Sequence, residues 1–204
     1  MTDAAIDLLA ASGVHGLTHR EVEKAAGLPV GTAANYFRSR QALLVATAER
    51  IVELHHADMD QATQAQMATA APPAATAGQL AEMLAEALFV AATTQRTRYL
   101  AIFELQLEAV RRPVLATALA GLADSSLRIT SGYHADLGQP IAQDQVPVLI
   151  TLYSGALFTL VTAPPETVSK GVVEGIVHAM LHGVLPDPTR PRRRVPGNRH
   201  TNRR

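Results

Sequence analysis

Residues 17–44 read LTHREVEKAAGLPVGTAANYFRSRQALL, and this stretch decides the fold. Thr18 and Glu21 have the spacing of a capping box, in which each side chain bonds the backbone N–H of the other residue. Leu17 and Val22 have the spacing of the hydrophobic staple that accompanies such a box. The sequence therefore predicts that a helix begins at Thr18.

A tight turn links this helix to a second short one. Gly27 and Pro29 end the first helix, and residues 30–36 form the next. A helix over residues 2–13 precedes the pair, and Ser39 is a suitable N-cap for a long helix that follows. Gly27 supplies the positive φ that the turn requires. This is the helix-turn-helix arrangement, whose second helix enters the major groove of DNA.

The remainder of the chain also predicts helices. It is rich in Ala, the best helix former, and runs of β-branched residues with a period of two are absent. Pro and Gly residues divide it into five further helices, at 76–93, 96–111, 114–137, 144–163 and 166–185. We predict an all-α protein of about nine helices, with an N-terminal three-helix helix-turn-helix domain and a C-terminal helical bundle.

Composition excludes several classes of protein. The chain has no Cys, which rules out disulfides, thiolate zinc sites and cysteine nucleophiles. No signal peptide is recognisable, so we expect a cytoplasmic protein. The motifs of serine hydrolases, P-loop proteins, dinucleotide-binding enzymes and zinc peptidases are missing, and we expect no enzyme. His178 and His182 share a helix face without a third ligand, so we expect neither a metal nor a cofactor.

The last two predicted helices carry a signal of their own. Residues 145–165 contain no charge, but their Pro, Ser, Thr and Gly residues dilute the hydropathy below that of a membrane span. Small residues recur through 144–163 and 166–185 and permit close helix approach. We interpret these helices as a four-helix homodimer interface, two from each copy of the chain.

The N-terminal segment resembles the N-terminal domain of the TetR family of transcriptional regulators. The resemblance covers about residues 4–50 without a gap and rests on LTHREV, AAGL, GT and YFRSRQALL, which begin at residues 17, 25, 31 and 36. The rest of the chain matches that family only in length and number of helices. The resemblance implies a homodimeric repressor that binds a palindromic operator and is released by a small effector held in an all-helical domain.

The resemblance also assigns DNA contacts. Thr18 and Arg40 stand at positions that contact phosphate, and Asn35 is the best candidate for reading a base because an Asn amide can pair bidentately with adenine. Phe37 is assigned to the core. The predicted set of double-stranded DNA contacts is Thr18, His19, Arg20, Gly31, Thr32, Asn35, Tyr36, Arg38 and Arg40.

The chain departs from the family pattern in two places and has an unusual charge distribution. Ala34 stands where the family usually has a Tyr, and Pro29 where a capping Ser is common. Residues 1–50 carry no net charge, whereas residues 186–204 are rich in Arg. We hypothesise that this tail attracts DNA phosphate. The alternative for the tail is that it is dispensable. The alternative for the whole chain is a helical dimer that acts through a protein partner without specific DNA binding.

Polar side chains on apolar helix faces predict the effector pocket, because pockets form between the helices of such bundles. The scarcity of aromatic and charged residues favours a small apolar or weakly polar effector. The predicted lining is Tyr99, Phe103, Gln106, Leu107, Tyr133, His134 and Tyr153.

The sequence also predicts how the chain divides into domains and how one charged helix face is solvated. We predict a DNA-binding domain at 1–45, a ligand-binding and dimerisation domain at 46–185, and a disordered tail at 186–204. Glu104 and Glu108 share a face near two Arg residues, which predicts a solvated, ion-paired surface.

Overall fold

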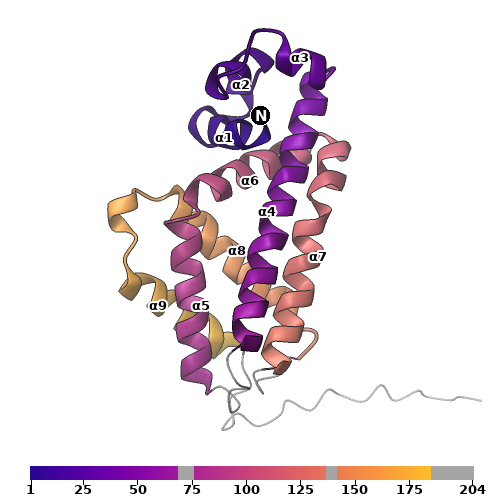
Figure 1. Ribbon diagram of the computed structural model, residues 1–204. Helices are drawn as coiled ribbons and strands as arrows, with labels where there is room; N and C mark the ends of the chain where they lie inside the picture. The colour runs from indigo at the N-terminus through magenta and orange to yellow at the C-terminus, as the bar shows by residue number, and fades with distance from the viewer. Residues whose placement is uncertain (69–75, 137–141, 185–204) are drawn as a thin grey trace, which may run out of the picture.

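The computed structural model describes residues 1–68, 76–136 and 142–184. These ranges contain nine α-helices, one short 3-10 helix and no strand, which confirms the predicted all-α fold. A small N-terminal head lies at one end of an elongated helical bundle (Figure 1). The Arg-rich segment predicted to be a disordered tail lies outside the described residues.

The head consists of α1 (Thr2–Gly16), α2 (His19–Ala25) and α3 (Thr32–Tyr36). The turn between α2 and α3 uses two glycines in the left-handed region, with φ of 66° at Gly27 and 92° at Gly31. Gly31 is the N-cap of α3, so this helix begins two residues later than predicted.

The start of α2 has the predicted Thr18 cap, which is one half of the predicted capping box, and the described residues show no bond from the Thr18 N–H to the Glu21 side chain. Thr18 Oγ1 accepts a hydrogen bond from the Glu21 backbone N–H at 3.2 Å. Leu17 and Val22 are fully buried, and Phe37 is buried in the same core, as predicted. Local sequence signals therefore fix where α2 begins.

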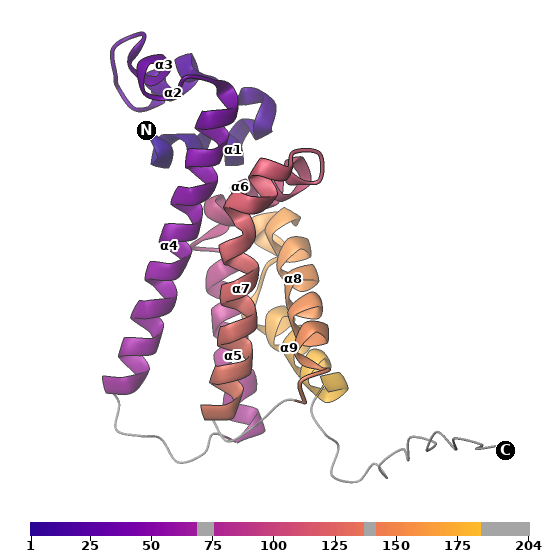
Figure 2. The same ribbon diagram turned by 90° about the vertical axis from the view of Figure 1, so that its right-hand side faces the viewer.

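The helix α4 (Arg40–Ala68) runs from the head along the length of the bundle (Figure 2). The helix α6 lies across the top of the bundle beneath α1, with which it makes an extensive contact. The bundle helices after α4 are α5 (Ala77–Ala92), α6 (Arg96–Ala109), α7 (Pro113–Asp136), α8 (Val146–Thr162) and α9 (Lys170–Val184).

One apolar core joins the head to the bundle. It includes Leu9 of α1, Leu44 of α4, Leu105 of α6 and Leu115 of α7, all fully buried. Burying each such side chain stabilises the fold by about 1.5–3 kcal/mol. The head is therefore packed onto the bundle through shared core residues. A movement of α4 or α6 would change the packing of the head directly.

A second apolar core lies between α5, α8 and α9. The helix α9 begins later than the predicted residue 166, because Pro165–Thr167 form the 3-10 helix η1. No helix in the described part of the chain is long and apolar enough to cross a membrane.

Candidate nucleic-acid interface

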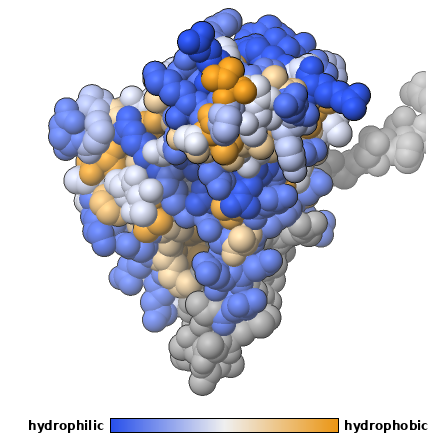
Figure 3. Space-filling view, turned by 45° about the horizontal axis from the view of Figure 1, so that its top comes forward, coloured by the Kyte–Doolittle hydropathy of each residue, from blue (hydrophilic) through white to orange (hydrophobic). Residues whose placement is uncertain are grey.

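The outer face of α3 is open to solvent. Asn35 and Arg38 are exposed, and Tyr36 is 75% exposed while its ring edge packs on Phe37, with 5.3 Å between the ring centroids. Viewed from the head end, the surface is largely hydrophilic (Figure 3). These side chains, predicted to contact DNA, are free to meet a ligand outside the fold.

The hydroxyl groups of two threonines bond to nearby backbone atoms at exposed positions. Thr18 uses one lone pair of its hydroxyl to cap α2 and keeps its O–H as a donor. Thr32 donates its hydroxyl to the Pro29 carbonyl at 2.7 Å. Arg20 is exposed on α2. Their predicted contacts with DNA remain predictions, compatible with this geometry.

The geometry gives His19 a partner inside the head. Its Nε2 lies 2.7 Å from the carbonyl oxygen of Phe37, the residue that follows α3. A carbonyl only accepts, so Nε2 carries the proton and donates it. The ring therefore holds the end of α3, a role that the sequence pattern did not predict.

Glu23 is a buried acid that sequence reasoning missed. The residue is 3% exposed, and its Oε1 accepts from the Ala33 backbone N–H at 2.8 Å. Burial by itself raises the pKa of Glu23, but hydrogen bonds from the backbone N–H groups of Gly31, Ala33 and Ala34 and the nearby His19 outweigh it, so this pKa is lowered. Its stabilising effect is therefore present at neutral pH and is lost as the pH falls through the lowered value.

Arg40, predicted to contact phosphate, binds two backbone carbonyls of the head. Its Nε donates to the Leu17 carbonyl at 3.0 Å, and its Nη2 donates to the Val14 carbonyl. The side chain is half-buried. These bonds join the start of α4 to the link between α1 and α2.

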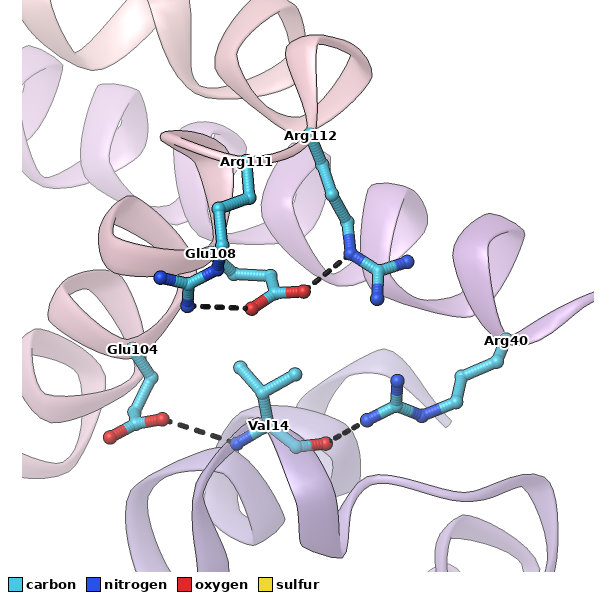
Figure 4. A network of polar contacts seen from close by, with 6 residues as sticks. All are labelled: Val14, Arg40, Glu104, Glu108, Arg111 and Arg112. Carbon is cyan, nitrogen blue, oxygen red and sulfur yellow. Dashed lines mark hydrogen bonds and ion pairs between the residues drawn. The ribbon is translucent and has the colours of Figure 1, made fainter.

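The same Val14 residue is held from the other side by the bundle (Figure 4). Gly13 breaks the helical geometry of α1, with φ of 64° and ψ of −176°. The Val14 N–H then donates to Glu104 Oε2 of α6 at 3.1 Å. A Cβ on Gly13 would lie 3.1 Å from the same oxygen, so the kink and the glycine both serve this contact.

Glu104 and Glu108 therefore differ, although they are one turn apart on α6. Glu108 forms ion pairs with Arg112 and Arg111, as the sequence predicts, and these hydrogen bonds lower its pKa. Glu104 instead faces the backbone of the head, which contradicts the predicted solvated face at that residue. Spacing along α6 could not reveal this, since the acceptor is needed only because α1 kinks.

The predicted effector pocket is only partly assembled. Tyr99, Phe103 and Tyr153 are half-buried and pack against the second core, and burial raises the pKa of both tyrosines. Phe103 also meets Phe158 of α8, with 5.0 Å between ring centroids. Gln106 is exposed and Leu107 is 58% exposed, because they lie beyond the buried face of α6, so neither joins this group. The side chains of Tyr133 and His134 lie outside the described residues.

A polar cluster beside these aromatic residues was not predicted. Asp58 of α4 accepts from Gln95 Nε2 at 2.9 Å and from Arg98 Nη1 at 2.7 Å. On the neighbouring surface of α4, His56 shares a hydrogen bond of 2.6 Å with Ser125 of α7. The charge of Asp58 is thus compensated within the bundle.

The two histidines of α9 lie one helical turn apart. His182 Nδ1 lies 2.8 Å from the His178 carbonyl, a contact within the helix. Among the described residues, no group of three or more His, Asp or Glu side chains is arranged to hold a metal ion.

The hydrogen bond between Glu104 and the Val14 N–H predicts how substitution of Glu104 changes the free energy of unfolding. Glu104→Ala removes the acceptor of the Val14 N–H, which lies in a residue only 7% exposed, and should lower the free energy of unfolding by about 1–3 kcal/mol in urea denaturation. Glu108→Ala, one turn away, removes ion pairs to two partly exposed arginines and should cost less than about 1 kcal/mol. Equal losses for the two variants would contradict the assigned role of Glu104.

Two family models match this chain. The model described as "Bacterial regulatory proteins, tetR family" matches residues 1–47. The model described as "Tetracyclin repressor-like, C-terminal domain" matches residues 75–187, more than half of the chain. None of the curated proteins matches it. The first match covers the head, and the second covers the bundle from α5 to α9.

Solved structures show the same fold. The multidrug binding protein EbrR complexed with ethidium is 25% identical, with 91% of this chain and 96% of that chain covered and a TM-score of 0.60. A TetR-family member from Streptomyces coelicolor A3 is 24% identical, with the same coverage and a TM-score of 0.61. A protein from Saccharomonospora viridis in complex with choline is 16% identical, with a TM-score of 0.69 and coverage of 91% and 96%. The chain belongs to the TetR family of DNA-binding transcriptional regulators.

Proposed function

We propose that this regulator is a repressor that binds a palindromic operator as a homodimer and is released by a small, uncharged effector. The observation that carries the proposal is the head itself, in which α3 presents Asn35 and Tyr36 outward and the exposed Arg38 follows the end of the helix. Side chains in this position reach base edges when the second helix of a helix-turn-helix pair lies in the major groove. The match to the regulator family supports a regulator rather than an enzyme.

The homodimer is supported by the uncovered face of α8 and α9. These helices lie side by side, on the side of the bundle away from α4 (Figure 2). Val148, Leu152 and Phe158 of α8 and Val172 of α9 are each more than 40% exposed. The space above Gly155, Gly171 and Gly175 is open for at least 4 Å. Small and apolar residues on one face suit the close packing of a four-helix dimer interface.

The uncharged effector is supported by the chemistry around Tyr99 and Tyr153. Both side chains are half-buried and burial raises the pKa of both phenol groups, and neither hydroxyl has a hydrogen-bond partner among the described residues. Asp58, a half-buried acid whose charge acts on Tyr99, is already paired with Arg98. A ligand with an aromatic or apolar body and a hydrogen-bond acceptor fits such a group, whereas an unpaired charge would be costly. The EbrR complexes with ethidium and proflavin support a flat aromatic body for the ligand, but both dyes are cations and do not support the absence of charge.

Selection of binding duplexes from a random DNA pool tests the proposal as a whole. We expect an enriched inverted repeat whose half-site centres are separated by about one helical turn or slightly more, since two heads of one dimer must reach them. A single half-site would contradict the dimer. No enrichment at low salt would contradict DNA recognition and favour a regulator that acts through a protein partner.

The dimer face has a separate test. Leu152→Glu places a charge on the proposed interface and should weaken dimerisation by about 100-fold or more, because an unpaired buried charge costs several kcal/mol. Leu127→Glu is the matched control, since Leu127 of α7 has a similar exposure, 49% against 42%. Sedimentation velocity of both variants should give a monomer only for the first. A monomeric wild-type chain at micromolar concentration would contradict the interface.

The effector site is tested with Nile red, an uncharged aromatic dye that carries a carbonyl acceptor. We expect saturable binding that Tyr153→Phe weakens by about 3–10-fold through loss of one hydrogen bond, while Tyr36→Phe on the head leaves it unchanged. Fluorescence titration with Nile red and with the cation ethidium provides the measurement. Binding of ethidium alone would show that the site selects cations.

A further inference from the structure

The helix α3 cannot be stable by itself. It has five residues, Thr32–Tyr36, and isolated helices of this length do not persist in water. Its N-cap is Gly31, which supplies no side chain to satisfy the first backbone N–H groups. Partners outside the helix must therefore hold both of its ends.

Glu23 of α2 holds the first end. Its Oε1 accepts from the Ala33 N–H at 2.8 Å, and the nearby backbone N–H groups of Gly31 and Ala34 help to lower the pKa of this carboxyl group. A negative charge at the N-terminus of a helix is stabilised by the helix dipole and by these donors. The carboxylate is almost fully buried, so water does not compete for it.

His19 of α2 holds the other end. Its Nε2–H donates to the carbonyl of Phe37, the C-cap of α3, at 2.7 Å. His19 and Glu23 are four residues apart and thus lie on the same face of α2. One turn of α2 therefore grips α3 at its start and at its end.

We infer that His19 and Glu23 form a clamp that sets the orientation of α3 and thereby the base specificity of the regulator. His19 is then a positioning residue and not a DNA contact. The inference rests on the proposed function, because it assigns α3 to base reading. Bidentate pairing of an Asn amide with a base edge tolerates little rotation of the helix, so a loosened clamp impairs base reading while phosphate contacts persist.

The test compares His19→Phe and Glu23→Gln with the wild-type chain. His19→Phe keeps an aromatic ring, of slightly larger size, without the N–H donor, and Glu23→Gln is isosteric and keeps one acceptor oxygen. Affinity is measured for the selected operator and for a scrambled duplex between 50 and 200 mM salt, after circular dichroism has shown that each variant is folded. We expect each variant to bind the operator about 10-fold more weakly, with unchanged affinity for the scrambled duplex and an unchanged salt slope.

Arg20→Gln on the same helix provides the contrasting pattern. Loss of a phosphate contact weakens binding to both duplexes and lowers the salt slope by about one. If His19→Phe gives this pattern, His19 contacts DNA and the inference is wrong. If neither variant changes the ratio of operator to scrambled affinity, the clamp does not set specificity.

Amide hydrogen exchange of the free protein separates the inference from the proposed function. We expect both variants to speed exchange at Ala33–Phe37 at least 10-fold, with exchange in α5 unchanged. A wild-type chain that binds no duplex contradicts the proposed function. The exchange rates of the two variants then test the clamp independently of DNA binding. Unchanged exchange in both variants would overturn the clamp, whatever the DNA result.

Discussion

A helix of five residues that must present its side chains at a fixed angle is the constraint on which the rest of this structure depends. Alone, α3 lacks the length to satisfy its own backbone. Its support comes from α2, where Glu23 accepts from the Ala33 N–H near the start of α3 and His19 donates to the carbonyl of Phe37, the residue after α3. The buried charge of Glu23 is tolerated because several backbone donors surround it. The orientation of the outer face of α3 is thus set by residues of α2, which lie beneath it.

The head is in turn anchored to the bundle by polar contacts as well as by the shared core. The kink at Gly13 directs the Val14 N–H to Glu104 of α6, and the Val14 carbonyl receives Arg40 of α4. The helix α6 also carries Tyr99 and Phe103, which lie among the residues proposed to meet the effector. The contact with the head and the residues proposed to meet the effector are therefore on the same helix, α6. If a ligand shifts α6, the contact between the bundle and the head shifts with it. A ligand acts through such a contact only by its difference in affinity for the two arrangements.

Much of the fold could be predicted because it is encoded locally. Thr18 with Glu21, and Leu17 with Val22, define the start of α2, and the glycines of the turn separate it from α3. The partners of single polar side chains could not be predicted, since they depend on tertiary approach. Glu104 and Glu108 have the same spacing pattern, yet only Glu108 forms the expected ion pairs. His19 and Arg40 were predicted to contact DNA from their positions in the motif, whereas their observed partners are carbonyls of the head. Gln106 and Leu107 follow the helical periodicity of Tyr99 but lie outside the buried face of α6.

Directed cleavage of DNA tests most directly the claim that α3 reads the operator. The natural chain has no Cys, so Ala34→Cys on the exposed face of α3 accepts a single iron–EDTA group, and Ala87→Cys on the exposed face of α5 is its control. The account predicts cleavage of the selected duplex within each half-site by the group at residue 34, and none by the group at residue 87. Cleavage from residue 87, or a bound duplex left intact by the group at residue 34, would contradict it.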